Sequence, residues 1–228
     1  PTGGRTSRLL RGALVGYGHQ FAVILVGLWL TPFLLHRLGE QRLGLWLVSG
    51  QLLGYLALMD LGVLALLPRE VAFASGSPDA RDARDRVGRL VSQVRLIVRW
   101  QLLLLSAAAL VVVLLLPAEW RELRWPLACT LAAFLALYPA RVYVAALQGL
   151  QDHAFLARSQ LFGWIVGTGV TIAVVLAGGG MYALVAGWIC TTGVPAFAAW
   201  TRTRGRWPDR HVGEAVEHSG QYFRRSGW

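Results

Sequence analysis

The sequence places few ionisable residues inside its long apolar stretches, and three of them share one level. His19, Asp60 and Arg141 each lie within a separate hydrophobic run. If these runs are helices that cross a bilayer in alternating directions, the rise of about 1.5 Å per residue puts His19 and Asp60 about 7 Å from mid-membrane. Arg141 lies about 5 Å from it by the same rise. All three are displaced toward the same side.

Charged groups at this depth need partners, since a charged side chain at mid-membrane costs at least about 2.5–3.5 kcal/mol. We expect Asp60 and Arg141 to pair in the interior of the helix bundle, with His19 and Gln20 nearby. In the alternative, Arg141 extends to the interface and Asp60 bonds to hydroxyl or backbone groups. The group could act as a structural clamp, or as a proton-coupling site because histidine titrates near neutral pH.

The elements that must position these residues are six hydrophobic spans. The chain is 55% hydrophobic and 15% charged, whereas soluble domains carry about 25% charged residues. About 20 apolar residues cross a hydrocarbon core of roughly 30 Å. No run shows the period-two alternation of a membrane strand, and lipid then favours helices. We therefore expect an all-α, polytopic transmembrane helix bundle. Its spans are 12–35, 43–67, 96–116, 125–150, 159–177 and 181–200.

The distribution of basic residues predicts the orientation of these spans. All 22 basic residues are arginines. Only four of them fall on one side of the predicted membrane, and these are Arg37, Arg42, Arg121 and Arg124. Because arginine-rich connections stay in the cytoplasm, residues 1–11 should form a cytoplasmic stub and residues 201–228 a basic cytoplasmic segment. The net charge of +10 therefore reflects membrane topology, and we expect no nucleic-acid partner.

Two local patterns predict further structure. Ser77, Pro78 and Asp79 resemble a helix start, with Ser77 as the cap. Behind them Asp82 with Arg86, and Asp85 with Arg89, have the favourable acid-first spacing of four residues. We expect an amphipathic helix at the inner membrane surface.

Glycine spacing predicts close helix contacts. The pairs Gly12 with Gly16, and Gly163 with Gly167, have the spacing that lets membrane helices approach closely. Cys129 and Cys190 both fall in apolar runs, where we expect packed thiols rather than a disulfide or a metal site. We expect no cofactor.

Two stretches of the sequence resemble one family of transporters. The first holds a proline-ended first span, a Leu-Gly turn, a Gly-aromatic start to the second span and an Asp-x-Gly near its end, followed by arginine. These features are Pro32, Leu38-Gly39, Gly44-Leu45-Trp46, Asp60-Leu61-Gly62 and Arg69. The second stretch is the Gln-Gly-Leu-Gln connection at residues 148–151. They resemble the O-antigen, or Wzx-like, oligosaccharide flippases of the multidrug/oligosaccharidyl-lipid/polysaccharide exporter superfamily. One departure is Arg42-Leu43-Gly44, where the family often has Tyr-Gly.

The resemblance covers roughly residues 10–200 and implies a fold and a function. It implies a transporter of two six-helix lobes, of which residues 12–200 form the amino-terminal lobe and residues 201–228 lead to a missing seventh span. It implies a bacterial inner-membrane protein, and not an enzyme, that flips a polyprenyl-diphosphate-linked oligosaccharide by alternating access. Proton or sodium coupling is possible.

The resemblance also adds a third role for the buried ionisable group. Arg141 would then contribute to a cationic cavity for the diphosphate, because the guanidinium fork matches phosphate oxygens. Arg69 and Arg99 lie at the inner mouth of the predicted spans and could receive the same diphosphate, although ordinary anchoring by positive charges explains them as well.

Three alternatives stay open, and one of them is a simple membrane anchor or scaffold. A multidrug exporter of the same superfamily would prefer apolar cavity walls with acids. A membrane-embedded enzyme of polysaccharide assembly would need paired carboxylates or a metal site, and the five histidines show no close ligand spacing.

Overall fold

The computed structural model describes residues 3–59, 62–76 and 79–204; the side chains of residues 3–19 and of Ala80 lie outside that description. Every regular element within it is helical. The elements are α1 (Gly3–Leu38), α2 (Glu40–Leu58), α3 (Val63–Ser75), α4 (Ala80–Leu114), η1 (Ala118–Trp120), α5 (Arg121–Leu137), η2 (Tyr138–Ala140), α6 (Arg141–Gly149), α7 (His153–Leu176) and α8 (Tyr182–Arg204).

These helices have the length and composition of a multi-pass membrane protein. Within the described residues, five helical segments are long and apolar enough to cross a membrane. The consecutive helices α2 and α3, which are bent by 54°, make a sixth if they are counted as one span. The predicted all-α class is therefore confirmed. The helices continue beyond several of the predicted span limits.

The second predicted span, 43–67, is not one continuous helix. Helix α2 ends at Leu58, and α3 begins at Val63 after Gly62, which has a left-handed φ of 75°. Glycine adopts this conformation without the steric cost that a Cβ atom imposes, so the sequence encodes a bend here that hydropathy does not reveal.

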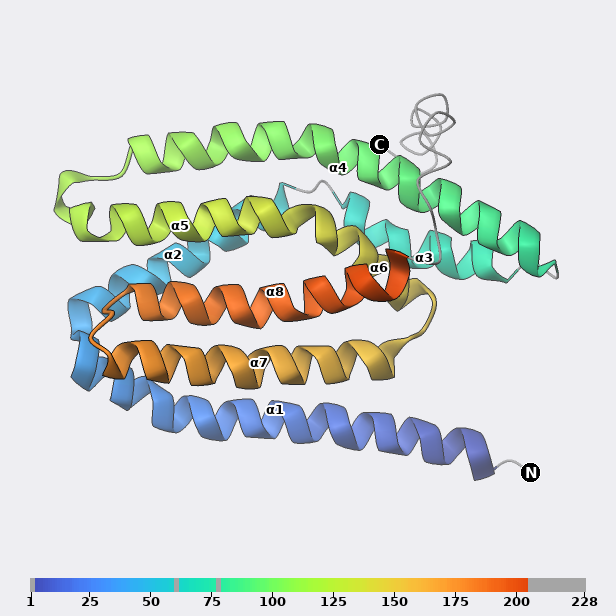
Figure 1. The fold of residues 1–228 in the computed structure, drawn as a ribbon, viewed down its shortest axis with the longest axis horizontal. Coiled ribbons are helices and arrows are strands. Elements are labelled where there is room, and N and C mark those ends of the chain that lie inside the picture. Colours follow the sequence, from blue (N-terminus) through green and yellow to red (C-terminus); the bar gives the residue numbers. More distant parts are fainter. Residues whose placement is uncertain (1–2, 60–61, 77–78, 205–228) are drawn as a thin grey trace.

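The fourth predicted span, 125–150, is broken as well. Helix α5 passes into the short 3₁₀ turn η2 before α6 begins at Arg141. Pro139 lies within η2, and proline removes a backbone donor and clashes with the preceding turn of an α-helix. The break shifts the direction of the chain between α5 and α6, which Figure 1 shows as a turn of the ribbon.

The predicted amphipathic surface helix is instead the beginning of α4. This helix runs without interruption for 35 residues, or about 52 Å at 1.5 Å per residue, well beyond a core of about 30 Å. Its cap is Asp79 rather than Ser77, since Asp79 accepts a hydrogen bond of 2.8 Å from the Arg81 amide. Ser77 and Pro78 lie outside the described residues. The predicted ion pair of Asp82 with Arg86 is present at 2.8 Å.

The helices alternate in direction, so that the connections gather at two ends of the bundle (Figure 1). The start of α1 and the end of α8 lie at the same end, together with the start of α4. At the opposite end, Arg42 of α2 forms an ion pair of 3.0 Å with Glu122 of α5. At the first end, Arg202 of α8 bonds to Asp152 at 3.2 Å. Arg42 and Arg202 therefore lie at opposite ends of the bundle, as the predicted arrangement by side requires of these two.

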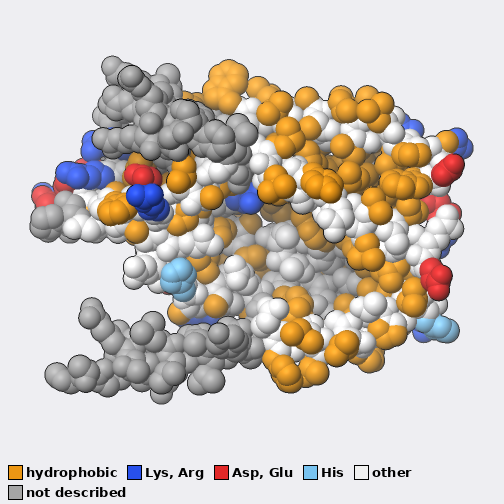
Figure 2. Space-filling model, turned by 180° about the vertical axis from the view of Figure 1, so that it is seen from behind, with side chains coloured by type: hydrophobic (Ala, Val, Ile, Leu, Met, Phe, Trp, Pro, Cys, Tyr) orange, Lys and Arg blue, Asp and Glu red, His pale blue; other side chains and the backbone are white. Residues whose placement is uncertain are grey.

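Among the described residues, three groups of buried side chains hold the bundle together, one of which joins α6 to α7 and α8 through Leu147, Leu156 and Ala199. The largest group takes residues from each of the helices α2 through α6. It includes Leu67, Val71, Val98 and Val142, which are all fully buried. A smaller group joins α1 to α7 and α8. The outer surface carries many exposed large hydrophobic side chains, and the face in Figure 2 is largely hydrophobic between two ends that carry charged groups. Such a surface suits contact with lipid.

Helices α7 and α8 approach each other closely at glycine residues. A Cβ atom on Gly163 would lie 2.8 Å from Cδ of Pro195, and one on Gly167 would lie 2.6 Å from the carbonyl oxygen of Gly187. The predicted close contact at Gly163 and Gly167 is confirmed. The predicted contact at Gly12 and Gly16 lies outside the described side chains.

The contact of α3 with α6 gives a test of this packing. A Cβ atom on Gly149 would lie 2.5 Å from the Pro68 carbonyl oxygen and 2.7 Å from Cβ of Val71. Gly149→Ala should therefore destabilise the purified protein by about 1–3 kcal/mol, measured by thermal unfolding in detergent. Gly54→Ala is the matched control because nothing lies within 4 Å of its Cβ position. Equal stability of the two variants would show that α3 and α6 are not packed in this way.

Candidate functional site

A cavity of about 490 Å³ lies where the break between α5 and α6 meets α3, α7 and α8. Most of its wall is apolar, and polar groups come from α6, α7 and α8. Its lining residues are Leu64, Ala65, Phe134, Leu137, Tyr138, Arg141, Val144, Ala145, Gln148, Gln160, Trp188, Thr191, Thr192, Pro195 and Ala196. The 3₁₀ turn η2 and Pro195, which lies inside the uninterrupted helix α8, both border it.

Arg141 is the charged residue in the wall of this cavity. It is the first residue of α6, directly after the 3₁₀ turn, and its side chain is half-buried. The guanidinium carbon Cζ lies 5.5 Å from the centre of the Tyr138 ring. The Nη1 atom is buried and has no hydrogen-bond partner among the described residues.

An unpaired donor of this kind has an energetic consequence. Leaving a buried polar group without a partner costs about 1–3 kcal/mol, and more when the group is charged. A ligand oxygen that reached Nη1 would remove this cost. An anion with several oxygens fits best, because the guanidinium fork can form two parallel hydrogen bonds with it.

The other polar residues of the cavity wall were not among the site residues predicted from the sequence. Gln148 and Gln160 have exposed side chains at the cavity. Thr191 and Thr192 lie opposite on α8, where the Thr192 hydroxyl donates to the Trp188 carbonyl at 2.8 Å. Each of these residues is polar and lies within or beside an apolar run, which marks it in the sequence as a candidate. The sequence does not show which faces of the helices meet, so it does not bring these residues together.

Among the predicted site residues whose side chains the structure describes, no common point is shared. Gln20 of α1, Arg69 of α3 and Arg99 of α4 are exposed and do not line the cavity. The side chain of Arg69 instead lies over the Phe73 ring at 5.7 Å. Of the four candidates whose side chains are described, only Arg141 belongs to the cavity wall. Asp60 and the side chain of His19 lie outside the described residues, so the pair of Asp60 with Arg141 stays a prediction.

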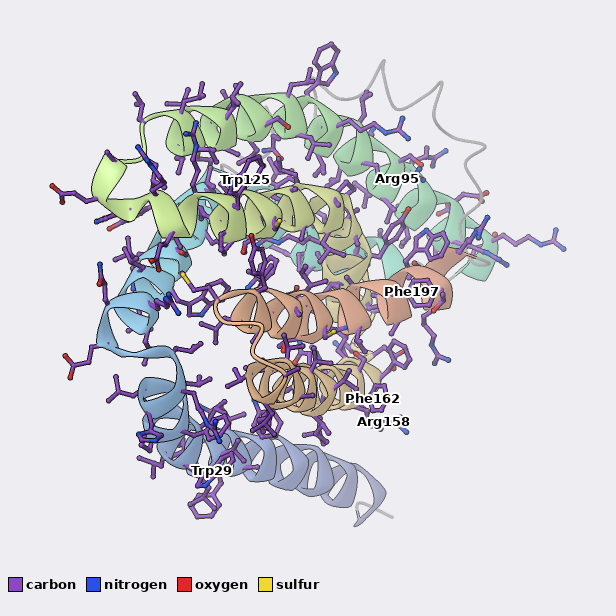
Figure 3. The ribbon with its side chains drawn as sticks, turned by 60° about the vertical axis from the view of Figure 1, so that its left-hand side comes forward. Trp29, Arg95, Trp125, Arg158, Phe162 and Phe197 are labelled. Carbon is purple, nitrogen blue, oxygen red and sulfur yellow. The ribbon has the colours of Figure 1, made fainter. Side chains whose placement is uncertain are left out.

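Other arginines also lie against aromatic rings. Arg95 of α4, labelled in Figure 3, has its Cζ 6.0 Å from the Tyr143 ring of α6. Arg202 lies 5.0 Å from the Phe155 ring. Figure 3 also labels Trp29, Trp125, Phe162 and Phe197, which are all more than half exposed. These aromatic side chains lie outside the cavity.

The described residues offer little for metal or thiol chemistry. Among them, no group of three His, Cys, Asp or Glu side chains could hold a metal ion. Cys190 is a partly buried free thiol. Cys129 is also free but exposed, so the expectation that it is packed was wrong.

Comparison of the chain with protein-family models, curated proteins and solved structures gives no match.

Proposed function

We propose that the protein is a membrane transporter that moves a polyprenyl-diphosphate-linked oligosaccharide across the bacterial cytoplasmic membrane, with both ends of the chain in the cytoplasm. The observation that carries this proposal is the buried, unpaired Nη1 of Arg141 at a largely apolar cavity. A cavity of this kind complements an anionic headgroup attached to a lipid.

Three further features support the proposal. The resemblance to oligosaccharide flippases includes the Gln-Gly-Leu-Gln connection, of which Gln148 lines the cavity. Broken helices at a cavity are typical of secondary transporters, and the break before α3 lies beside this one, as does the 3₁₀ turn before α6. The unequal distribution of arginines supports the cytoplasmic placement of the chain ends.

The nature of the cavity wall favours an anionic cargo over cationic drugs. Among the residues that line it, none is acidic and one is an arginine. A multidrug exporter for cations would place its positively charged substrates beside Arg141, where like charges repel. The described part of the chain therefore favours the flippase over the multidrug exporter.

Equilibrium binding to the purified protein tests this assignment. A polyprenyl-diphosphate-linked oligosaccharide should bind saturably, and more tightly than the polyprenol of equal length without phosphate. The expected difference is about 10-fold, because hydrogen bonds to charged groups contribute about 1.5–3 kcal/mol. Equal affinity for the polyprenol, or tighter binding of a cationic amphiphile, would refute the proposed cargo.

A further inference from the structure

Tyr138 occupies the junction between the broken fourth span and α4. It lies in the 3₁₀ turn η2 directly after Leu137, and only 1% of its surface is exposed. The hydroxyl donates to Oε1 of Gln101 on α4 at 3.3 Å. The ring also lies 5.7 Å from the Phe134 ring, centre to centre. Contacts on two sides therefore fix the plane of the tyrosine ring.

Arg141 lies above this fixed ring. Its Cζ atom is 5.5 Å from the ring centre, within the range in which a guanidinium is attracted to an aromatic face. An attraction of this kind does not require the hydrogen-bond donors at the N–H edge of the guanidinium. The unpaired Nη1 belongs to that edge, so the tyrosine can hold the cation without occupying its donors.

We infer that Tyr138, anchored by Gln101, is a positioning residue that holds the Arg141 guanidinium at the cavity wall with its donors available to a diphosphate. The inference rests on the proposed function, because it assumes that Arg141 contacts an anionic ligand. An arginine side chain has many rotamers, and a contact that restricts them before binding reduces the entropy lost on binding. Tyrosine suits this role because the ring restrains the arginine while the hydroxyl attaches the ring to α4.

The test measures the affinity of the purified protein for two probes, farnesyl diphosphate and farnesol. Tyr138→Leu removes the aromatic face and should weaken binding of farnesyl diphosphate about fivefold or more. Its affinity for farnesol should stay unchanged, because that probe reports the apolar cavity alone. Tyr138→Phe keeps the ring but loses the hydrogen bond to Gln101, so it should bind farnesyl diphosphate about twofold to threefold more weakly than the original protein and clearly more tightly than Tyr138→Leu.

The chain offers a matched control and a second variant. Phe73→Leu removes the exposed ring beneath Arg69, at a similar distance of 5.7 Å, and should change neither affinity. Gln101→Leu leaves the ring in place but removes its anchor. It should weaken binding of farnesyl diphosphate about twofold to threefold without affecting farnesol, and it decides the question if Tyr138→Leu does not fold.

The outcomes separate this inference from the proposed function. If Arg141→Gln binds farnesyl diphosphate as tightly as the original protein, the proposed function fails. If Arg141→Gln binds weakly but Tyr138→Leu binds normally, only the positioning role fails. If Tyr138→Leu loses affinity for both probes equally, the tyrosine supports the cavity and does not position the arginine.

Discussion

Arg141→Gln is expected to slow translocation of a labelled polyprenyl-diphosphate oligosaccharide by about 10-fold or more in reconstituted vesicles. The substitution keeps a polar side chain of similar length but removes the charge and the guanidinium fork. Hydrogen bonds to charged groups contribute about 1.5–3 kcal/mol, and each 1.4 kcal/mol corresponds to about 10-fold. The fold should tolerate the change, because a buried donor without a partner is removed rather than created.

Arg99→Gln is the matched control for this prediction. It removes the same charge from a neighbouring transmembrane helix, but Arg99 is exposed and does not line the cavity. Its translocation rate should stay within about twofold of the original protein. Equal rates for the two variants would mean that Arg141 acts only as one of many positive charges.

Gly167→Leu should have the largest effect on stability. At this position, α7 approaches α8 so closely that an added Cβ atom would lie 2.6 Å from the Gly187 carbonyl oxygen and 3.0 Å from the Thr191 amide nitrogen. These are backbone atoms, which cannot move aside as a side chain can. Overpacking costs about 1–3 kcal/mol in well-packed cores and occasionally more. We expect about 3 kcal/mol or more, seen as a lower unfolding temperature in detergent.

Gly169→Leu provides the comparison on the same helix. Nothing lies within 4 Å of a Cβ atom built at Gly169, so leucine there should leave the unfolding temperature nearly unchanged or raise it slightly. A loss of stability at Gly169 as large as that at Gly167 would contradict the α7–α8 interface. Because Thr191 also lines the cavity, Gly167→Leu should reduce ligand binding as well.

The sequence predicts where apolar helices lie better than it predicts where they bend. Hydropathy marks where helices are apolar enough for lipid, and this signal depends on composition averaged over a whole span. The bend at Gly62 and the 3₁₀ turn at Pro139 depend on single residues within runs that stay hydrophobic. The start of α4 shows the same limit, because the polar segment before the third span continues its helix rather than forming a separate one.

One residue of the candidate site could be predicted from the sequence. Arg141 stands out in sequence because a charge within an apolar run is costly. Arg69 and Arg99 followed from their position near the ends of spans, but span position does not tell which face of a helix a side chain occupies. Gln160 and Thr191 come from different helices, and their meeting at the cavity depends on packing between α7 and α8 that span assignment does not provide.

The most direct measurement is leaflet exchange of the proposed cargo in proteoliposomes. A labelled polyprenyl-diphosphate-linked oligosaccharide is placed in both leaflets, and a reagent that cannot cross the membrane modifies only the outer population. The account predicts that the protected inner population becomes accessible with the protein present, and about 10-fold or more slowly with Arg141→Gln. Exchange no faster than in protein-free vesicles, or equal exchange with Arg141→Gln, would contradict it.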